Sequence, residues 1–459
     1  MTSNTETFIV KDIKVFKENL VSSLRNEAVF CLLDSNDYYS GKDLGKHPYY
    51  HDYDLLCAFG VRQMLKCGFW SSFEELDQFK AQNPNEWIFG YFGYDLKNEI
   101  EELHSENEDH LRFEDMVFFI PETVIAIKGD IAICEGNAAP IKKIFSGTIN
   151  FPTESHAVDS EADSAVNPQS PFKETLRGSY NPISLQNRLK KEYYLETVEK
   201  LRQHIIEGDV YEVSFCQEFY ADNVEIKPSQ IYQSLCEISP QPFGVYMRVD
   251  DKYIMCASME RYLKKSGSKL ISQPIKGTIR RGNNEIEDES LKTILLNDEK
   301  ERAENVMIVD LVRNDLSRVC APGTVKVEEL FGIYDFPGVF QMISTVTGEL
   351  LPGKTDLDAI KASFPMGSMT GAPKIMAMSI IEQYEQTKRG VYSGAIGYFS
   401  PDGDFDFNVV IRTLLYNASK KYLSLHVGSA ITYDSDPEKE YEECFVKIKT
   451  ILKALGNKS

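Results

Sequence analysis

The stretch 394–427, GAIGYFSPDGDFDFNVVIRTLLYNASKKYLSLHV, contains three β-rich runs in close succession. They span residues 394–399, 409–416 and 422–427, and their β-branched, aromatic and other apolar residues favour strands. A doubly wound parallel sheet requires a helix after each strand, because parallel neighbours are joined by a crossover connection. The strands of this chain do not each follow a helix, so the pattern predicts a large α+β fold.

Further helical patterns and β-rich runs flank this stretch. Strand-like runs occur at 28–33, 117–127, 253–257 and 339–349, and helical patterns occur at 55–65, 73–82, 190–207, 300–316, 373–385 and 437–455. Between 146 and 184 the chain is rich in Ser, Pro and acidic residues without a sustained period, which predicts an exposed linker. The linker separates an N-terminal region, 1–145, from a C-terminal region, 185–459.

Composition indicates a large globular protein. Of the 459 residues, 42% are hydrophobic, which excludes wholesale disorder. The formal net charge of −20 opposes binding to nucleic acid or an anionic membrane. No apolar stretch approaches the roughly 20 residues of a membrane span, so we expect a cytoplasmic protein. The nine cysteines stand singly, without CxxC pairs, and this pattern favours small buried hydrophobes over disulfides or zinc ligands.

Two predicted helices begin with a pair of acidic residues beside an apolar stripe. Glu440 and Glu443 lie three residues apart before Cys444, and Glu301 and Glu304 repeat this arrangement before the stripe of 307–311. Such acids also suit an ordinary solvated helix start. If the two pairs faced one another near the core, however, they would favour a hard cation with oxygen ligands, of which Mg²⁺ is the natural candidate.

Two further segments have residue types suited to a reaction site. The stretch 364–374, FPMGSMTGAPK, has glycines and free amides that suit either an anion site or an ordinary helix entry, and it lacks the Gly-Lys-Ser/Thr ending of a P-loop. The stretch 274–282, PIKGTIRRG, places Lys276 directly after a β-rich run. A lysine is usually solvent-exposed, so Lys276 becomes a candidate catalytic residue only in combination with the other motifs.

Taken together, these segments resemble the chorismate-utilising enzymes, which include anthranilate synthase component I, aminodeoxychorismate synthase component I, isochorismate synthases and salicylate synthases. The resemblance covers about 190–455 most strongly. It rests on GDVYEVSFCQ (208–217), SMERYL (258–263), PIKGT (274–278), AENVMIVDLVRNDLSRV (303–319), FPMGSMTGAPK (364–374), RGVYSGAIGYFS (389–400) and the final acidic helix.

The resemblance implies a sandwich of two facing antiparallel sheets with surrounding helices. In the PIxGT motif anthranilate synthases typically carry Ala, whereas aminodeoxychorismate synthases that use a lysine nucleophile carry Lys, as at Lys276. The resemblance thus implies amination of chorismate at C4 to 4-amino-4-deoxychorismate, for p-aminobenzoate and folate synthesis. The alternatives are anthranilate synthase component I, which places nitrogen at C2, and a catalytically silent scaffold that retains the fold.

Residue roles follow from the same resemblance. It implies Mg²⁺ bound directly by Glu304 and Glu443 and through water or outer contacts by Glu301 and Glu440, Lys276 as nucleophile and Glu260 as general acid. The implied substrate-binding residues are Gly277, Thr278, Tyr392, Arg412, Gly428 and Lys447. In some members an N-terminal segment lines a tryptophan pocket, here at Leu33, Asp34 and Ser35, with Asp34 in place of the usual Glu.

Three positions depart from the pattern of these enzymes. Gln341 stands where they usually have His, and Met259 replaces a frequent Pro, which we expect to change only packing. Glu212 stands where isochorismate and salicylate synthases have a catalytic Lys, which argues against water as the nucleophile. The sequence shows no glutaminase region, so we expect a separate glutamine amidotransferase subunit, or free ammonia, to supply nitrogen, and another enzyme to release pyruvate.

Overall fold

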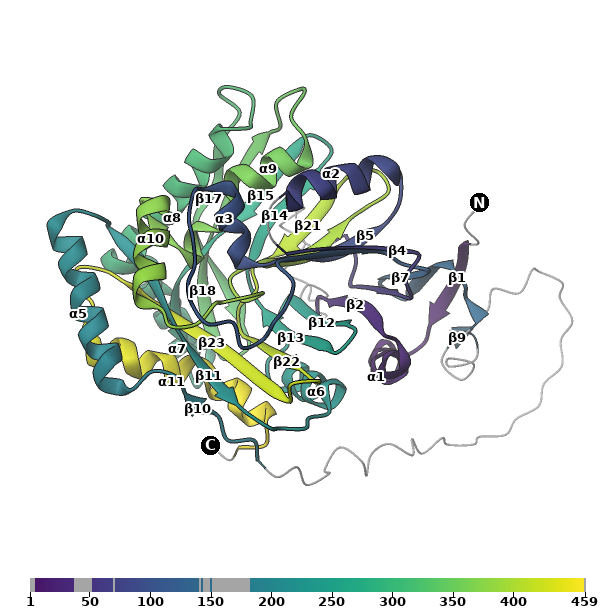
Figure 1. The fold of residues 1–459 in the computed structure, drawn as a ribbon, viewed down its shortest axis with the longest axis horizontal. Coiled ribbons are helices and arrows are strands. Elements are labelled where there is room, and N and C mark those ends of the chain that lie inside the picture. Colours follow the sequence, from purple (N-terminus) through teal and green to yellow (C-terminus); the bar gives the residue numbers. More distant parts are fainter. Residues whose placement is uncertain are drawn as a thin grey trace, which may run out of the picture.

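The computed structural model describes residues 5–36, 52–68, 71–139, 142, 149–150 and 182–457. Within these ranges the strands form two sheets, here called sheet A and sheet B, and every ladder between named strands is antiparallel. Helices surround the sheets (Figure 1). The expected α+β class, with two facing antiparallel sheets, is therefore confirmed.

Sheet A has 13 strands, and its spatial order mixes early and late segments. In that order they are β10 (Gln186–Asn187), β11 (Glu212–Ala221), β23 (Tyr422–Ile431), β22 (Thr413–Asn417), β13 (Lys252–Ser258), β12 (Phe243–Val249), β2 (Val29–Asp34), β3 (Leu55–Phe59), β7 (Thr123–Lys128), β8 (Ile131–Gly136), β1 (Thr5–Val10) and β9 (Ile149–Asn150), while β19 (Gly371–Ala372) pairs with β11.

Sheet B has 10 strands. In spatial order they are β16 (Ile275–Arg280), β18 (Val339–Glu349), β15 (Lys269–Gln273), β14 (Arg261–Ser266), β21 (Phe405–Asn408), β20 (Ala395–Phe399), β5 (Ile88–Phe92), β6 (Met116–Ile120) and β4 (Gln63–Cys67), while β17 (Lys326–Phe336) pairs with β18. The pairs β12–β2 and β20–β5 join early to late strands. Each sheet thus contains strands from both sides of the 146–184 segment, which, apart from 149–150 and 182–184, lies outside the described residues.

The stretch 394–427 supplies strands to both sheets. β20 and β21 belong to sheet B, whereas β22 and β23 belong to sheet A. The chain passes between the sheets after Asn408, and Arg412 adopts a left-handed conformation with φ of 53° just before β22 begins. The expected single run over 409–416 is therefore shorter, because its first residues form this crossing.

The helices are α1 (Ile13–Ser23), α2 (Ser72–Gln82), α3 (Lys97–Ile100), α5 (Lys191–Glu207), α6 (Pro228–Ile238), α7 (Glu285–Asn297), α8 (Glu299–Ser317), α9 (Asp356–Ser363), α10 (Lys374–Tyr384) and α11 (Pro437–Ala454), with short 3₁₀ turns at Leu24–Asn26, Tyr94–Leu96 and Gly367–Met369. Five of the expected helical patterns correspond to α2, α5, α8, α10 and α11 and are confirmed. The helix expected at 55–65 is wrong, because the apolar run of β3 is a buried strand of sheet A and the chain then turns at Gly60, with φ of 70°, into β4 of sheet B.

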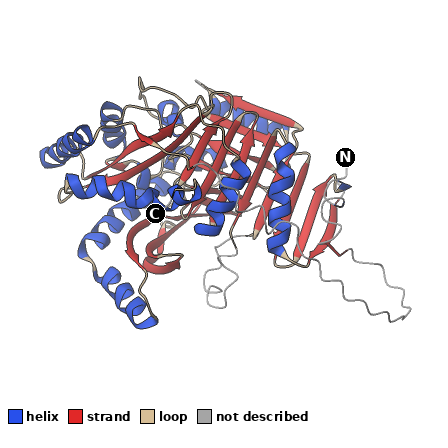
Figure 2. Ribbon diagram, turned by 90° about the horizontal axis from the view of Figure 1, so that it is seen from below, coloured by secondary structure: helices blue, strands red, loops and turns tan. Residues whose placement is uncertain are grey.

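The core has two main layers, which follow from the alternation of side chains along the strands. Phe30 and Leu32 of β2 belong to the layer on the outer face of sheet A, which also contains apolar residues of α1, α5, α6, α10 and α11. Cys31 points the other way, into the layer between the sheets, together with Phe89 and Tyr91 of β5. Figure 2 shows helices lying across the broad sheets.

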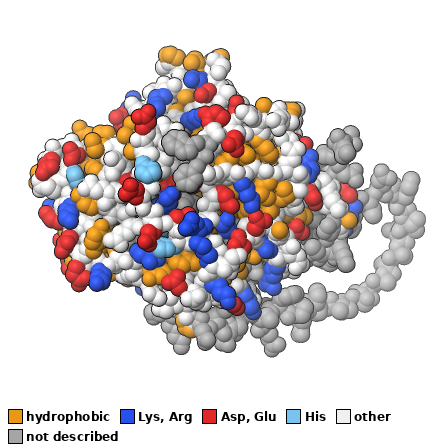
Figure 3. All heavy atoms as spheres, in the orientation of Figure 1, with side chains coloured by type: hydrophobic (Ala, Val, Ile, Leu, Met, Phe, Trp, Pro, Cys, Tyr) orange, Lys and Arg blue, Asp and Glu red, His pale blue; other side chains and the backbone are white. Residues whose placement is uncertain are grey.

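The charged side chains on one face of the molecule are mixed in sign. Figure 3 shows Lys and Arg side chains interspersed with Asp and Glu over one face, so the net charge of −20 does not form a single patch there. Of the helices that the structure describes, none is both long and apolar enough to cross a membrane.

Candidate active site

Helix α8 places one acidic pair against the strand that contains Lys276. Its N-cap residue Asp298 accepts a hydrogen bond from the backbone N–H of Glu301 at 3.0 Å, which fixes the first turn. The side chain of Glu304 lies one turn further on and is 12% exposed. Asn305, which is buried, donates from Nδ2 to the carbonyl oxygen of Lys276 at 3.2 Å and so holds β16 against α8.

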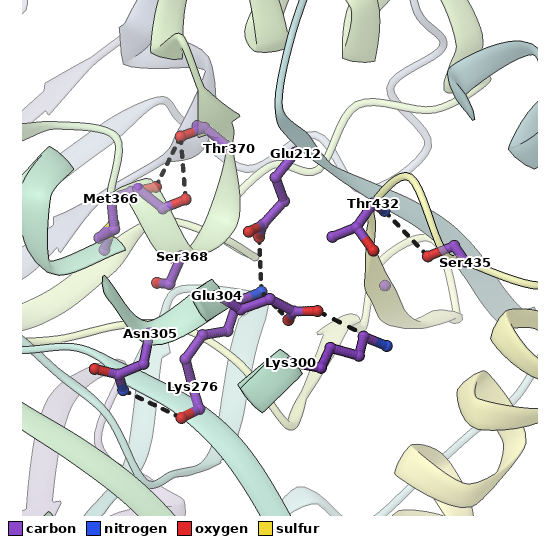
Figure 4. Close-up of polar contacts among 12 residues, drawn as sticks. Glu212, Lys276, Lys300, Glu304, Asn305, Met366, Ser368, Thr370, Thr432 and Ser435 are labelled. Atoms are coloured by element: carbon purple, nitrogen blue, oxygen red, sulfur yellow. Dashed lines mark hydrogen bonds and ion pairs between the residues drawn. The ribbon is translucent and has the colours of Figure 1, made fainter. Parts of the chain in front are cut away.

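Lys276 lies between two carboxylates from distant parts of the chain. Its Nζ donates to Oε1 of Glu212, at the start of β11, at 2.6 Å and lies 3.6 Å from Oε2 of Glu304. Figure 4 shows the ammonium group pointing at both acids. Burial lowers the pKa of Lys276, but the charges of Glu212, Glu304 and Glu301 outweigh burial and raise it above its usual range. In this arrangement Lys276 is a charged ammonium group.

The acids of α8 share a second positive neighbour. Nζ of Lys300 lies 3.8 Å from Oε1 of Glu304, and the lysine side chain is 54% exposed. Burial raises the pKa values of Glu301 and Glu304. The negative charges of Glu304 and Asp298 raise the pKa of Glu301 further, whereas the positive charge of Lys300 opposes the increase at both acids.

Helix α11 holds the second acidic pair. Its N-cap residue Asp436 accepts from the N–H of Lys439 at 3.0 Å, and Oε1 of Glu440 accepts from the hydroxyl of Ser435 at 2.8 Å. Burial raises the pKa of Glu440, which is 7% exposed. Glu443 lies on the same side of the helix, and its side chain is half-exposed.

Glu443 and the acids of α8 interact with the same two lysines. Burial raises the pKa of Glu443, but Lys447 and then Lys276 and Lys300 outweigh this effect and lower it. The same Lys276 and Lys300 act on Glu304. Lys276 and Lys300 thus act on one carboxylate of each acidic pair. Within the described ranges, however, no three His, Cys, Asp or Glu side chains are grouped closely enough to hold a metal ion by themselves.

Four of the expected substrate-binding residues form a linked group beside α11. Nζ of Lys447 donates to the carbonyl oxygen of Gly428 at 2.8 Å and lies 2.6 Å from Oε1 of Glu443. Nη1 of Arg412 donates to the carbonyl oxygen of Lys447. Burial lowers the pKa of Arg412, while Tyr392 and Glu443 oppose that shift. Gly428 is required here, because a Cβ would lie 2.4 Å from Sγ of Cys216.

Tyr392, another expected substrate contact, is buried. It is 4% exposed, and its ring stacks on His426 with centroids 5.4 Å apart. Burial raises its pKa well above the usual range. The neighbouring Arg389 is also buried and donates to the carbonyl oxygens of Ser214 and Met369 at 2.9 and 2.7 Å. Arg389 thus links β11 to the 364–374 loop.

Glu260 lies in the short connection between β13 and β14, opposite the 364–374 loop. The hydroxyl of Ser368 donates to Oε1 of Glu260 at 2.7 Å. Burial raises the pKa of Glu260 to about 7, although the Ser368 hydrogen bond and the charge of Lys276 oppose the increase. A carboxyl group in this state can release a proton near neutral pH.

Gly277 and Thr278 continue β16 beyond Lys276. A Cβ on Gly277, where φ is 103°, would lie 3.3 Å from Oε2 of Glu301. The hydroxyl of Thr278 donates to Oε1 of Gln341 on β18 at 2.6 Å. Nε2 of Gln341 in turn donates to Sδ of Met259 at 3.2 Å. The expectation that Met259 affects only packing is therefore wrong, since its sulfur atom accepts this bond.

Leu33, Asp34 and Ser35 lie apart from the site around Lys276. They line a different cavity together with Tyr53, Phe243, Gly244, Tyr398 and Asn408. Asp34 is 6% exposed, and its Oδ1 accepts from Nζ of Lys17 at 2.8 Å.

Three contacts at the site escaped sequence reasoning. These are the ion pair of Glu212 with Lys276, the hydroxyl of Ser368 on Glu260, and the amide of Asn305 on the carbonyl of Lys276. Ser368 and Asn305 stand inside the motifs quoted above. Glu212 gave a weak signal in the sequence, because it stands at a position where isochorismate and salicylate synthases have a catalytic Lys.

Comparison with known proteins gives a consistent result. The family model described as "chorismate binding enzyme" matches residues 46–453. "Anthranilate synthase component 1" of Thermus thermophilus is 36% identical over 368 residues, which cover 80% of this chain and 77% of the relative. "Aminodeoxychorismate synthase component 1" of Bacillus subtilis is 41% identical over 262 residues, which cover 57% of this chain and 55% of the relative.

Solved structures support the same fold. Anthranilate synthase component I from Streptococcus pneumoniae superimposes with a TM-score of 0.71 at 28% identity, over 86% of this chain and 91% of that one. The menaquinone-specific isochorismate synthase from Escherichia coli gives a TM-score of 0.73 over 99% and 94% of the two chains. The latter match has 16% identity and bears on the fold alone.

Proposed function

The chain belongs to the family of chorismate-binding enzymes, and from this membership we propose that it aminates chorismate at C4 to give 4-amino-4-deoxychorismate. The observation that carries the proposal is the position of Lys276. Its Nζ reaches Glu212 and Glu304 at the centre of the site, where a nucleophile would meet the substrate. Similarity to the aminodeoxychorismate synthase component 1 of Bacillus subtilis supports the choice.

The acidic pairs have the donor chemistry that suits Mg²⁺. This ion prefers oxygen ligands and is often held by one or two carboxylates, with water and an anionic substrate completing its shell. Glu304 and Glu443 would bind it directly, while Glu301 and Glu440 would act through water or outer contacts. When bound, Mg²⁺ supplies positive charge that neutralises the ring carboxylate of chorismate.

Lys276 converts one difficult substitution into two displacements. After passing a proton to solvent, Nζ attacks C2 of the ring, both double bonds of the ring diene shift by one position, and the hydroxyl group leaves C4. Ammonia then attacks C4, both double bonds return to their original positions, and the lysine leaves C2 with the electron pair of its C–N bond. The net change replaces the C4 hydroxyl with an amino group and releases one water molecule.

Glu260 would protonate the departing hydroxyl. Its carboxyl group is buried, has a pKa of about 7, and is oriented by Ser368. Protonation converts a poor leaving group into water, which is general acid catalysis. The charge of Lys276 opposes the increase in the pKa of Glu260.

The remaining polar groups recognise the second carboxylate of chorismate, on its enolpyruvyl side chain. Arg412 and Lys447 contribute two positive charges, with Tyr392 and the backbone of Gly428 beside them. A guanidinium group can bind a carboxylate through two parallel hydrogen bonds. Gly277 and Thr278 would contact the substrate on the side of the site where Glu301 lies.

We propose that nitrogen arrives as ammonia from a separate glutamine amidotransferase subunit, and that a lyase acting on the product releases pyruvate to give p-aminobenzoate for folate synthesis. The purified chain should then use ammonium salts directly and use glutamine only after the amidotransferase is added. Glutamine-dependent turnover by this chain alone would contradict this division of labour.

A second candidate is amination at C2, which forms anthranilate. The ion pair between Lys276 and Glu212 favours it, because a charged lysine cannot attack until it loses a proton. Incubation with chorismate, Mg²⁺ and an ammonium salt separates the two reactions. A product with nitrogen at C4 supports the proposal, while fluorescent anthranilate as the main product would replace it with the second candidate.

A further inference from the structure

One buried oxygen at the centre of the site lacks a hydrogen-bond donor. Glu212 is 1% exposed, and its Oε1 accepts from Lys276 at 2.6 Å. Its Oε2 is also buried, and no group in the described part of the chain donates to it. A buried carboxylate oxygen without a donor is unfavourable, because it has lost water without gaining a partner. Such an atom inside a reaction site indicates a ligand that brings an N–H or O–H group.

The hydroxyl groups of the neighbouring loop are committed elsewhere. Thr370 donates to the carbonyl oxygen of Met366 at 3.1 Å, and Ser368 donates to Glu260 at 2.7 Å. Figure 4 shows the carboxylate of Glu212 between Lys276 and this loop. The loop is held at this point, because Gly371 pairs with β11. The two backbones are so close that a Cβ added to Gly371 would lie 2.1 Å from the carbonyl oxygen of Glu212.

The chemistry of the reactants limits which of them can donate a hydrogen bond to Oε2 of Glu212. The two carboxylates of chorismate are anions that accept hydrogen bonds, so Glu212 repels them. Ammonia and ammonium carry only N–H bonds, three or four of them, and are small enough to enter beside Lys276. Since the lysine leaves the ring as ammonia attacks, the two nitrogen atoms must border the same ring at the same stage.

We propose that Oε2 of Glu212 binds the nitrogen substrate, ammonia or ammonium, by accepting one of its N–H groups. One carboxylate then serves both nitrogen atoms, with Oε1 facing Lys276 and Oε2 facing the incoming nucleophile. This inference rests on the proposed amination. It assigns to Glu212 the binding of a substrate.

Separated half-reactions test this role. The enzyme is first incubated with chorismate and Mg²⁺ without nitrogen, and the lysine adduct is measured by intact-protein mass spectrometry. An ammonium salt is then added, and the decay rate of the adduct is measured against ammonium concentration. In Glu212→Gln the adduct should still form, while the ammonium concentration for half-maximal decay rises about tenfold or more, as expected for loss of a charge-assisted hydrogen bond.

Glu218→Gln is the matched control. Glu218 lies on the same strand and is 2% exposed, but its oxygens already accept from Tyr422, Ser424 and Arg188. We expect this variant to leave the ammonium dependence unchanged even if it lowers stability. An unchanged ammonium dependence in folded Glu212→Gln would overturn the inference.

Failure of the proposed function can be distinguished from failure of this inference. If the native enzyme forms no adduct, the covalent step fails, and the steady-state KM values then decide the role of Glu212. A raised KM for ammonium with an unchanged KM for chorismate supports the ammonium site. An increase confined to the KM of chorismate would assign Oε2 to the hydroxyl of that substrate and overturn the inference.

Discussion

Gln341 donates a hydrogen bond to the sulfur atom of Met259 at 3.2 Å, which joins two positions where this chain departs from the pattern of related enzymes. The other end of the Gln341 amide accepts from Thr278 at 2.6 Å. Two hydrogen bonds therefore connect the side chains of Met259, Gln341 and Thr278 beside Lys276. Gln341 orients the hydroxyl group of Thr278, which we expect to contact chorismate.

Gln341→Leu removes both hydrogen bonds at similar volume. We expect the KM for chorismate to rise about fivefold and the free energy of unfolding to fall by about 1 to 2 kcal/mol, the usual contribution of two such bonds. Met259→Leu is the matched control, because it keeps the packing and removes only a weak sulfur acceptor. Equal effects of the two changes on KM would argue against orientation of Thr278 by Gln341.

Glu304→Gln tests the proposed metal ligand. The variant keeps the shape of the side chain but removes the charge, so we expect Mg²⁺-dependent turnover to disappear and calorimetric binding of Mg²⁺ to weaken strongly. Glu443→Gln should behave in the same way. Melting temperatures should stay within about 5 °C of the native value, because neither carboxylate is part of the apolar core. Full activity of either folded variant, or of the native enzyme in a chelator, would contradict the metal assignment.

Lys300→Ala should tighten Mg²⁺ binding. The lysine lies 3.8 Å from Glu304 and lowers the pKa of Glu443 as well, so its positive charge competes with a cation for both helices. Since its side chain is half-exposed, we expect a modest decrease of the dissociation constant, roughly two- to fivefold.

Lys439→Ala provides the control for Lys300→Ala. Lys439 stands four residues before Glu443, as Lys300 does before Glu304, yet no ion pair joins Lys439 to Glu443 among the described contacts. The same change of net charge should leave Mg²⁺ affinity unaltered. If both variants tighten binding equally, the effect of Lys300 reduces to net charge.

Glu260 predicts the pH dependence of adduct formation. Its pKa of about 7 means that the acid is protonated below this pH and loses its proton above it. The rate of adduct formation, measured without nitrogen so that ammonium does not titrate, should therefore carry a falling limb near pH 7. Glu260→Gln should lack this limb and react about 100-fold or more slowly. A native profile that rises steadily through this range would assign the proton to another group.

The same ionisation affects stability, with a definite sign. The pKa of Glu260 is raised in the folded protein, so the stability that it contributes is complete below the pKa of the unfolded chain and is lost as pH rises through about 7. Glu260→Gln should consequently gain stability relative to the native enzyme above pH 7. Chemical denaturation at pH 5 and pH 8 measures this difference.

The sequence predicted those parts of the site that lie on single helices. The pairs Glu301–Glu304 and Glu440–Glu443 follow from helical spacing, and Lys276 and Lys300 act on the pKa of one carboxylate in each pair, Glu304 and Glu443. Contacts across sheets could not be read in this way. Glu212 lies 64 residues before Lys276, and their meeting depends on where β11 and β16 lie in two different sheets.

Local ambiguity explains the error at 55–65. The run LLCAF can form either a buried strand or one turn of a buried helix, and only tertiary context separates these states. In the structure β2 and β7 flank β3 on both sides, which favours the extended form. The α+β class survived this error, because it rests on the successive strands of 394–427.

Lys276→Ala separates amination at C4 from amination at C2. The variant keeps the acidic pairs and the positive charges that recognise chorismate, so we expect loss of most C4 amination and slow attack of ammonia at C2, which yields anthranilate. Fluorescence and product mass distinguish the outcomes. Formation of 4-amino-4-deoxychorismate at the native rate would show that the lysine is dispensable.

The central claim is that Lys276 forms a covalent bond with the substrate. Intact-protein mass spectrometry of the native enzyme, mixed with chorismate and Mg²⁺ in the absence of nitrogen, tests this claim most directly. We predict a species heavier by one chorismate less one water, which maps to Lys276, is absent from Lys276→Ala and disappears when ammonium is added. Absence of this species from an enzyme that makes 4-amino-4-deoxychorismate under the same conditions with ammonium present would contradict the covalent mechanism.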